Sequence, residues 1–229
     1  MSYGHDLERM YDAIRDDTRI IFISNPNNPT GTFIPPTEIL RFIESVPEHI
    51  LVILDEAYYE YLPENLQSDS VNWIKRFPNL LVTRTFSKIY GLASFRVGYG
   101  MANPSLAEVL NRVRQPFNVN SYGLAAAAAA LSDDAFVRAS VQANNIGMRQ
   151  LVSVAEKLEL AYIPSHGNFL TIEFKQAGIE VYTKLLERGI IVRPLGGYGL
   201  PYHLRVSVGL ESENERLCVA LESLINSLA

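Results

Sequence analysis

Residues 80–96 read Leu-Leu-Val-Thr-Arg-Thr-Phe-Ser-Lys-Ile-Tyr-Gly-Leu-Ala-Ser-Phe-Arg, an apolar run that passes into a loop with a single lysine. The run at 80–85 predicts a buried strand. Similar runs occur at 19–23 and 50–54, with an amphipathic helical pattern at 37–46 between them. This alternation is typical of an α/β protein with a mainly parallel sheet flanked by helices. Because the two later runs are apolar on both alternations, we expect helices on both faces of that sheet.

The texture changes in the second half of the chain, where strands become shorter. We expect helices at 121–131 and 134–159, then strands at 169–174, 190–193 and 204–208. Asn103 followed by Pro104 predicts a helix start, and the serine and glutamate of the S-E-N-E stretch at 212–215 form a capping box that predicts the start of the terminal helix. The division that follows is a large domain at residues 1–133 and a smaller C-terminal α+β domain at residues 134–229.

Composition excludes several classes of function. The 229 residues are 48% hydrophobic and 20% charged, with a net charge of -5 and no cluster of basic residues, so nucleic acid is not an expected partner. The single cysteine, Cys218, excludes an intrachain disulfide and a cysteine-based metal cluster, and we expect no metal. No apolar stretch has the length of a membrane span or signal peptide, so we expect no membrane partner and a cytoplasmic location.

The loop after residues 80–85 carries groups that suit an anion. Thr85 and Ser87 place hydroxyls on either side of Phe86 and next to Lys88, and Arg96 adds a planar guanidinium. Hydroxyls and a guanidinium together suit a phosphate dianion, and a lysine beside such a site can form a Schiff base with a tethered aldehyde. For this segment taken alone, an ordinary surface lysine is the competing interpretation.

Asp55 and Tyr58 follow the apolar run at 50–54 in the sequence Asp-Glu-Ala-Tyr. A carboxylate at the end of so hydrophobic a run is costly to bury unless it meets a cation or a strong donor. The cation could be a protonated ring nitrogen of a cofactor, and a structural ion pair is an equally good interpretation of this segment alone.

Two further segments offer polar groups next to expected strands. Residues 24–31, Ser-Asn-Pro-Asn-Asn-Pro-Thr-Gly, form a turn in which Asn28 could present its amide to a ligand, although an ordinary strand-to-helix loop explains the same residues. In His-Leu-Arg-Val-Ser-Val-Gly at 203–209, Arg205 interrupts an apolar strand. It could clamp a substrate carboxylate or form a structural salt bridge.

In this order, N-N-P-T-G, D-E-A-Y, T-F-S-K with an arginine eight positions after the lysine, and L-R-V-S-V-G resemble the fold type I, class I/II aminotransferases, which use pyridoxal 5'-phosphate (PLP). Within that group the chain looks most like the histidinol-phosphate aminotransferases, through P-N-N-P-T-G, G-I-I-V-R-P-L and Y-G-L-P. The resemblance runs over nearly the whole chain and implies the PLP-dependent transferase fold.

The resemblance also implies roles for single residues. Lys88 would be the Schiff-base lysine, Asp55 would pair with the pyridine nitrogen, and Tyr58 and Asn28 would bind the phenolic oxygen of the ring. The phosphate would be held by Thr85, Ser87 and Arg96. Arg205 would bind the substrate carboxylate, with Asn168 of G-N-F-L close to the substrate, and the peptide bond before Pro29 is expected to be cis.

Two features depart from the family pattern. Ser94 stands where relatives usually have glycine, two residues before the arginine expected to hold the phosphate. Relatives also have a large N-terminal region, with a ring-stacking aromatic residue and a phosphate-binding loop, that has no counterpart before Ser24. The expected fold is therefore incomplete at its N-terminus.

The resemblance implies amino transfer from histidinol phosphate or an aromatic amino acid to 2-oxoglutarate, in amino-acid and histidine biosynthesis, by a homodimer. A catalytically incomplete fragment of such an enzyme is a second interpretation, because of the missing region. A related PLP-dependent decarboxylase is a third, since such enzymes share these motifs.

Overall fold

The computed structural model describes residues 3–226, whose contacts divide them into two compact units. The first unit consists of residues 3–27 and Phe33–Arg138, and the second of Asn28–Thr32 and residues 139–226. Each unit has its own sheet and core. The expected domain boundary at residues 133 and 134 stays a prediction about the whole protein.

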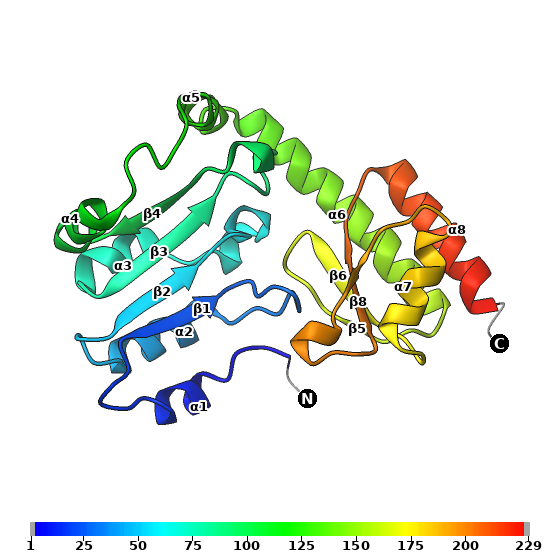
Figure 1. Cartoon of the computed structure of the whole chain (residues 1–229), viewed down its shortest axis with the longest axis horizontal. Coiled ribbons are helices and arrows are strands. Elements are labelled where there is room, and N and C mark those ends of the chain that lie inside the picture. The colour runs from blue at the N-terminus through cyan, green and yellow to red at the C-terminus, as the bar shows by residue number, and fades with distance from the viewer. Residues whose placement is uncertain (1–2, 227–229) are drawn as a thin grey trace. The chain divides into compact units, whose positions relative to one another are not determined.

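The first unit is built on a four-stranded sheet in the order β1-β2-β3-β4 (Figure 1). Its strands are β1 (Ile20–Ser24), β2 (Leu51–Asp55), β3 (Leu80–Thr85) and β4 (Gly98–Ala102). The first three are parallel, and β4 runs antiparallel to β3. The mainly parallel sheet expected from the sequence is confirmed, and its first three strands lie within one residue of the expected runs.

Helices pack against one face of this sheet. The helices are α1 (Leu7–Asp12), α2 (Pro36–Ser45) and α3 (Ser70–Arg76). Apolar side chains from all three join one cluster with the buried strand residues, among them Ile23, Val52 and Val82. Alternate residues on β1 face the other way, and Ile20 and Phe22 are 48% and 65% exposed. The expectation that helices cover both faces is therefore wrong for the residues described, because only the face towards α1, α2 and α3 is fully buried.

Two more helices of the first unit are α4 (Pro104–Val113) and α5 (Ser121–Ala130). The predicted start of α4 is confirmed, since Asn103 caps it by accepting from the Ser105 N–H. In α5, Gly123 packs so closely that an added Cβ would lie 2.6 Å from Val97 Cγ2. Small residues thus let α5 approach the segment before β4.

The second unit contains an antiparallel sheet in the order β5-β6-β8-β7. Its strands are β5 (Tyr162–Ile163), β6 (Phe169–Glu173), β7 (Arg193–Pro194) and β8 (His203–Ser207). Its helices are α7 (Gly178–Leu186), α8 (Glu211–Asn226) and most of α6 (Asp134–Lys157), within which the division between the units falls. Leucine side chains of α6, β6, α7, β8 and α8 form its core. The expected α+β architecture is confirmed.

Two local expectations for the second unit are wrong. Residues 190–192 are not in a strand, because only Arg193 and Pro194 pair with β8. The terminal helix begins at Glu211, and its start is held by Glu213, whose side chain accepts from the Leu210 N–H at 2.8 Å. Only the glutamate half of a capping box is therefore present, and it lies two residues earlier in the chain than the serine and glutamate at 212 and 215 suggested. Among residues 3–226, no helix combines the length and the apolar character needed to cross a membrane.

The segment before α1 is tied to the end of β1 by a hydrogen bond that depends on pH. The Ser24 N–H donates to Nε2 of His5 at 3.2 Å, which requires that nitrogen to be unprotonated. Burial lowers the pKa of His5 below its usual value of 6.5. A lowered pKa means that the folded state binds the proton less readily than the unfolded state, so this contribution to stability is present above pH 6.5 and is lost as the pH falls.

We expect His5→Gln to lower the free energy of unfolding at pH 7.5 by about 1 kcal/mol, the typical net value of one hydrogen bond. At pH 5 the variant and the parent should differ little. Fluorescence of the only tryptophan, Trp73 in α3, reports unfolding of this unit. The exposed His49, changed to glutamine, is the control. An equal loss at both pH values would contradict the account.

Candidate functional site

In the first unit, Asp55 lies at the carboxyl end of β2, directly opposite Thr83 of β3. Its carboxylate accepts from the Thr83 hydroxyl and from the Ala57 N–H, both at 3.2 Å. The side chain is only partly buried, so these donors orient the carboxylate without closing it off. Such a carboxylate can hold a cationic group that approaches the end of the sheet.

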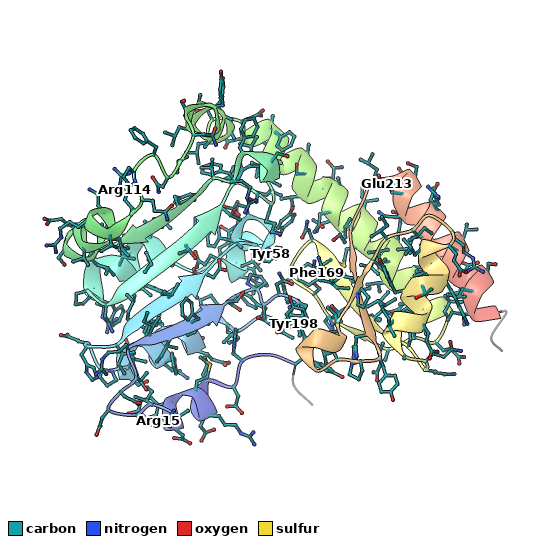
Figure 2. The ribbon with its side chains drawn as sticks, in the orientation of Figure 1. Arg15, Tyr58, Arg114, Phe169, Tyr198 and Glu213 are labelled. Carbon is teal, nitrogen blue, oxygen red and sulfur yellow. The ribbon has the colours of Figure 1, made fainter. Side chains whose placement is uncertain are left out.

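Tyr58 and Lys88 come together at the same end of the sheet. Tyr58, labelled in Figure 2, is 3% exposed, and its ring centroid lies 5.3 Å from the Lys88 ammonium nitrogen. They come from the loops after β2 and β3, which parallel pairing brings side by side. The structure thus brings three of the predicted residues, Asp55, Tyr58 and Lys88, to one end of the sheet.

The three residues expected to hold a phosphate also lie together. Thr85 Oγ1 accepts from the Ser87 N–H at 3.0 Å, and Arg96 Nη1 lies 3.5 Å from Ser87 Oγ. Arg96 is held by a 2.8 Å hydrogen bond to the Ala93 carbonyl, and its backbone is left-handed with a φ of 56°. Its exposed guanidinium and the two hydroxyls form a donor set suited to a dianion.

Glu56, the residue after Asp55, forms a buried ion pair with Arg84 that the sequence motifs did not predict. Arg84 donates to Glu56 Oε2 from Nε at 3.0 Å and from Nη2 at 2.8 Å. The only sign of this ion pair in the sequence was a charged residue in or next to each of two apolar segments. Their pairing depends on the strand register, which a sequence alone does not give.

In the second unit, Asn28 and Arg205 are in direct contact. Arg205 Nη1 donates to Asn28 Oδ1. The loop is anchored at Pro29, whose carbonyl accepts from the buried Thr171 hydroxyl at 2.6 Å, and at Gly31, whose carbonyl accepts from the His166 N–H at 2.9 Å. The peptide bond before Pro29 is cis, as expected, and so is the one before Pro26.

Asn168 precedes β6, and its carbonyl accepts from the Val208 N–H at 2.9 Å, next to the end of β8. The following residue, Phe169, has its ring centroid 5.2 Å from Arg205 Cζ. These contacts put Asn168 near Arg205 along the β6–β8 pairing. Its expected contact with a substrate stays a prediction.

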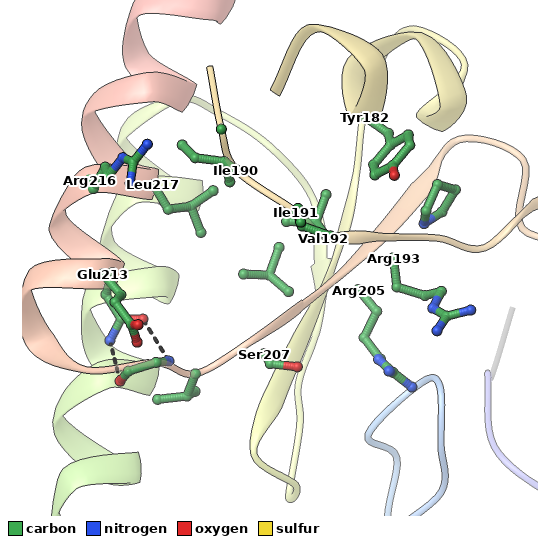
Figure 3. Close-up of a pocket in the computed structure, with 16 residues that line it drawn as sticks. Tyr182, Ile190, Ile191, Val192, Arg193, Arg205, Ser207, Glu213, Arg216 and Leu217 are labelled. Carbon is green, nitrogen blue, oxygen red and sulfur yellow. Dashed lines mark hydrogen bonds between the residues drawn. The ribbon is translucent and has the colours of Figure 1, made fainter. Parts of the chain in front are cut away.

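Arginine side chains line a pocket of about 690 Å³ in the second unit (Figure 3). Arg193 and Arg205 are paired across β7 and β8, and Figure 3 shows their side chains extending to the same side. Neither takes part in an ion pair within the described residues. The buried Nε of Arg205 has no hydrogen-bond partner. The pocket is also lined by Glu213, which has no ion pair with either arginine, so the two guanidiniums remain suited to an anion.

No group of three or more His, Cys, Asp or Glu side chains in the described part of the chain is arranged to hold a metal ion.

Residues 1–221 match the family Aminotransferase class I and II. Histidinol-phosphate aminotransferase 1 of Idiomarina loihiensis is 53% identical over 98% of this chain, and histidinol-phosphate aminotransferase 2 of Nitrosospira multiformis is 54% identical over 97%. The chain spans only 61% and 58% of the length of these relatives.

A solved structure is also similar to this chain. It is the histidinol-phosphate aminotransferase of Sinorhizobium meliloti in complex with pyridoxal-5'-phosphate, with a TM-score of 0.93 and 30% identity. The match covers 100% of this chain and 63% of that one.

The anchoring of the Asn28 loop can be tested at Gly31. Both Gly31 and Gly199 have a positive φ, 78° and 75°, but an added Cβ would lie 2.8 Å from the Cα of Ser165 at Gly31 and in open space at Gly199. We expect Gly199→Ala to cost about 1 kcal/mol for the left-handed backbone alone, and Gly31→Ala to cost about 3 kcal/mol because overpacking is added. Urea unfolding followed by circular dichroism measures both, and equal costs would contradict the close packing of this loop.

Proposed function

Because this chain belongs to the class I and II aminotransferases, we propose that it forms part of a PLP-dependent enzyme that transfers an amino group from histidinol phosphate to 2-oxoglutarate. One observation carries the proposal: the Lys88 amine lies beside the Tyr58 ring at the end of the sheet that also presents Asp55. The 53% identity to a histidinol-phosphate aminotransferase supports this choice of donor.

The donor set of the first unit fits PLP. Asp55 has a partly exposed carboxylate that can face the ring nitrogen, and Tyr58 would donate to the phenolic oxygen. The family resemblance gives the same role to Asn28, which belongs to the second unit. Thr85, Ser87 and Arg96 would hold the phosphate. The contacts among these last three residues support that assignment, since they gather two hydroxyls and a guanidinium with no carboxylate bound to them.

When bound, PLP supplies an aldehyde carbon for covalent attachment and a ring that accepts electrons from the substrate α-carbon. Asp55 would hold the proton on the ring nitrogen, which would keep the ring positively charged. Lys88 would provide the amine for attachment, and its Nζ, when free, would carry the α-proton. Tyr58, buried next to Lys88, keeps water from one side of the amine.

Arg205 would bind the carboxylate of the amino acid or 2-oxo acid, because its guanidinium can do so with two parallel hydrogen bonds. Arg193 beside it supplies a second guanidinium. Two guanidiniums match the dianionic phosphate of histidinol phosphate better than they match the uncharged ring of an aromatic amino acid. Asn168 would contribute a polar group at the edge of this pocket. These assignments favour histidinol phosphate as the donor.

The proposal extends to the whole protein. It would be a cytoplasmic homodimer that acts on small amino and 2-oxo acids in histidine biosynthesis, with residues 1–133 in its large PLP-binding domain and residues 134–229 in its small domain.

A second candidate is that the polypeptide of 229 residues binds PLP only weakly. The exposure of Ile20 and Phe22 on β1 favours it, since exposed apolar side chains on a sheet face are typical of a surface that another segment covers.

A related decarboxylase would release carbon dioxide from its substrate without using 2-oxoglutarate, so an assay for both products separates it from an aminotransferase.

We expect PLP added to the chain to produce a yellow absorbance band, and borohydride to fix the cofactor on the peptide that contains Lys88. Lys88→Ala should remove both signals and nearly all turnover, because Lys88 supplies the amine that lies beside the Tyr58 ring. Lys75→Ala, at a surface position of α3, is the matched control and should behave like the parent.

A fixed cofactor in Lys88→Ala at the parent level would refute the assignment. The absence of any yellow band in the parent would favour the second candidate.

The role of Arg193 gives a separate prediction. Arg193→Gln should weaken binding of histidinol phosphate about tenfold, since one charge-assisted contact to a phosphate is worth roughly 1.4 kcal/mol or more. Binding of glutamate, whose α-carboxylate needs only Arg205, should change less. A spectral titration of the PLP-loaded protein measures both, and equal losses for the two ligands would contradict the assignment of Arg193 to the phosphate.

A further inference from the structure

The ion pair between Glu56 and Arg84 is one of the most buried charged contacts among the described residues. Their side chains are 4% and 11% exposed. The Glu56 carboxylate also accepts hydrogen bonds from two hydroxyls, Ser70 Oγ at 2.9 Å and Ser68 Oγ. The Arg84 guanidinium also lies 3.5 Å from the ring centroid of Tyr59. Few of the polar atoms at this pair are left for any ligand.

The position of the ion pair connects it to the proposed site. Asp55 and Thr83 meet on one face of the sheet, and the next residues along each strand, Glu56 and Arg84, meet on the other. The Glu56 N–H donates to the Thr83 carbonyl at 2.9 Å, so the ion pair and the Asp55 contact share this stretch of backbone. Holding Glu56 against Arg84 therefore also fixes the direction in which the Asp55 side chain projects from the end of β2.

A second carboxylate links Arg84 to the loop that carries Lys88. Burial raises the pKa of Glu60, and the charge of Arg84 acts against that rise. Burial and then the charge of Glu60 raise the pKa of Tyr90, two residues after Lys88, to about 12, so Tyr90 keeps its proton. Arg84 thus faces carboxylates from the segment after β2, while its own strand leads directly to Lys88.

Stability alone is a weak explanation for such a contact. Buried ion pairs can often be replaced by neutral residues without loss of stability, because removing two charges from water offsets their attraction. What a two-hydrogen-bond contact between guanidinium and carboxylate does supply is a fixed geometry.

We infer that the Glu56–Arg84 ion pair is a positioning device that holds the ends of β2 and β3 so that Asp55 and Lys88 face the same bound ring. The inference about the cofactor rests on the proposed function. The inference about the backbone at Asp55 does not, and it can be tested without cofactor.

The main variant is Glu56→Gln with Arg84→Met, which removes both charges and keeps similar side-chain lengths. The matched control makes the same exchange at the exposed ion pair between Glu44 and Arg76, whose atoms lie 2.7 Å apart with side chains 38% and 63% exposed. Each protein is measured for its unfolding midpoint and, without cofactor, for amide hydrogen exchange of the peptide at residues 54–59. With PLP, its dissociation constant and the pH midpoint of the yellow band are measured.

We expect the double variant to unfold near the parent midpoint and to exchange the amides of Glu56 and Ala57 about tenfold faster, as for loss of roughly 1.4 kcal/mol of local stability. PLP should bind about tenfold more weakly, and the pH midpoint should shift by about half a unit or more, because the Asp55 charge is no longer held at one place. The control should match the parent in every measurement.

Should the double variant fail to fold, Arg84→Lys serves in its place, since it keeps the charge and loses the pair of hydrogen bonds from Nε and Nη2 to Glu56 Oε2. It should show the same changes in smaller measure.

A folded variant with the exchange rate of the parent would overturn the inference. So would faster exchange with unchanged PLP affinity and pH midpoint, which is the result for a purely structural contact. A parent that binds no PLP would defeat the proposed function, and the exchange rates would still decide whether the ion pair holds the backbone at Asp55.

Discussion

The parallel pairing of β2 and β3 is the constraint on which the first unit depends. Its register puts Asp55 opposite Thr83 and lets the Glu56 N–H donate to the Thr83 carbonyl. Because both strands end at the same edge, the loops that follow them begin side by side, and Lys88 comes to lie beside Tyr58. A change of register by one residue would turn Asp55 to the face now occupied by Glu56.

The second unit has a corresponding constraint at the loop Asn28–Thr32. Thr171 and His166 hold it from the segment around β6, and a glycine at residue 31 permits the close approach to Ser165. Asn28 is thereby held against Arg205 on β8. Arg205 is thus contacted by the side chain of a loop residue more than a hundred residues earlier in the sequence, and that loop is itself held by its own carbonyl groups.

Much of this could be predicted from the sequence, since apolar runs identify strands and a lysine, a tyrosine and an aspartate after such runs identify the end of a sheet. Leu80–Thr85 was predicted to the residue for this reason. The Glu56–Arg84 ion pair and the membership of Asn28 in the second unit could not be predicted, because both depend on contacts between distant residues. The cap at Glu213 was missed because that stretch contains two possible helix starts, each followed three residues later by a glutamate. The expectation of helices on both faces of the sheet was wrong because apolar strand residues do not show which other segments are present to cover a face.

The most direct measurement of the central claim is a crystal structure of this chain grown with PLP. The account predicts electron density continuous from the Lys88 side chain, with the ring nitrogen within hydrogen-bond distance of Asp55 and the phosphate against Thr85, Ser87 and Arg96. Density for PLP at another lysine, or Asp55 turned away from the ring of a cofactor bound to Lys88, would contradict it.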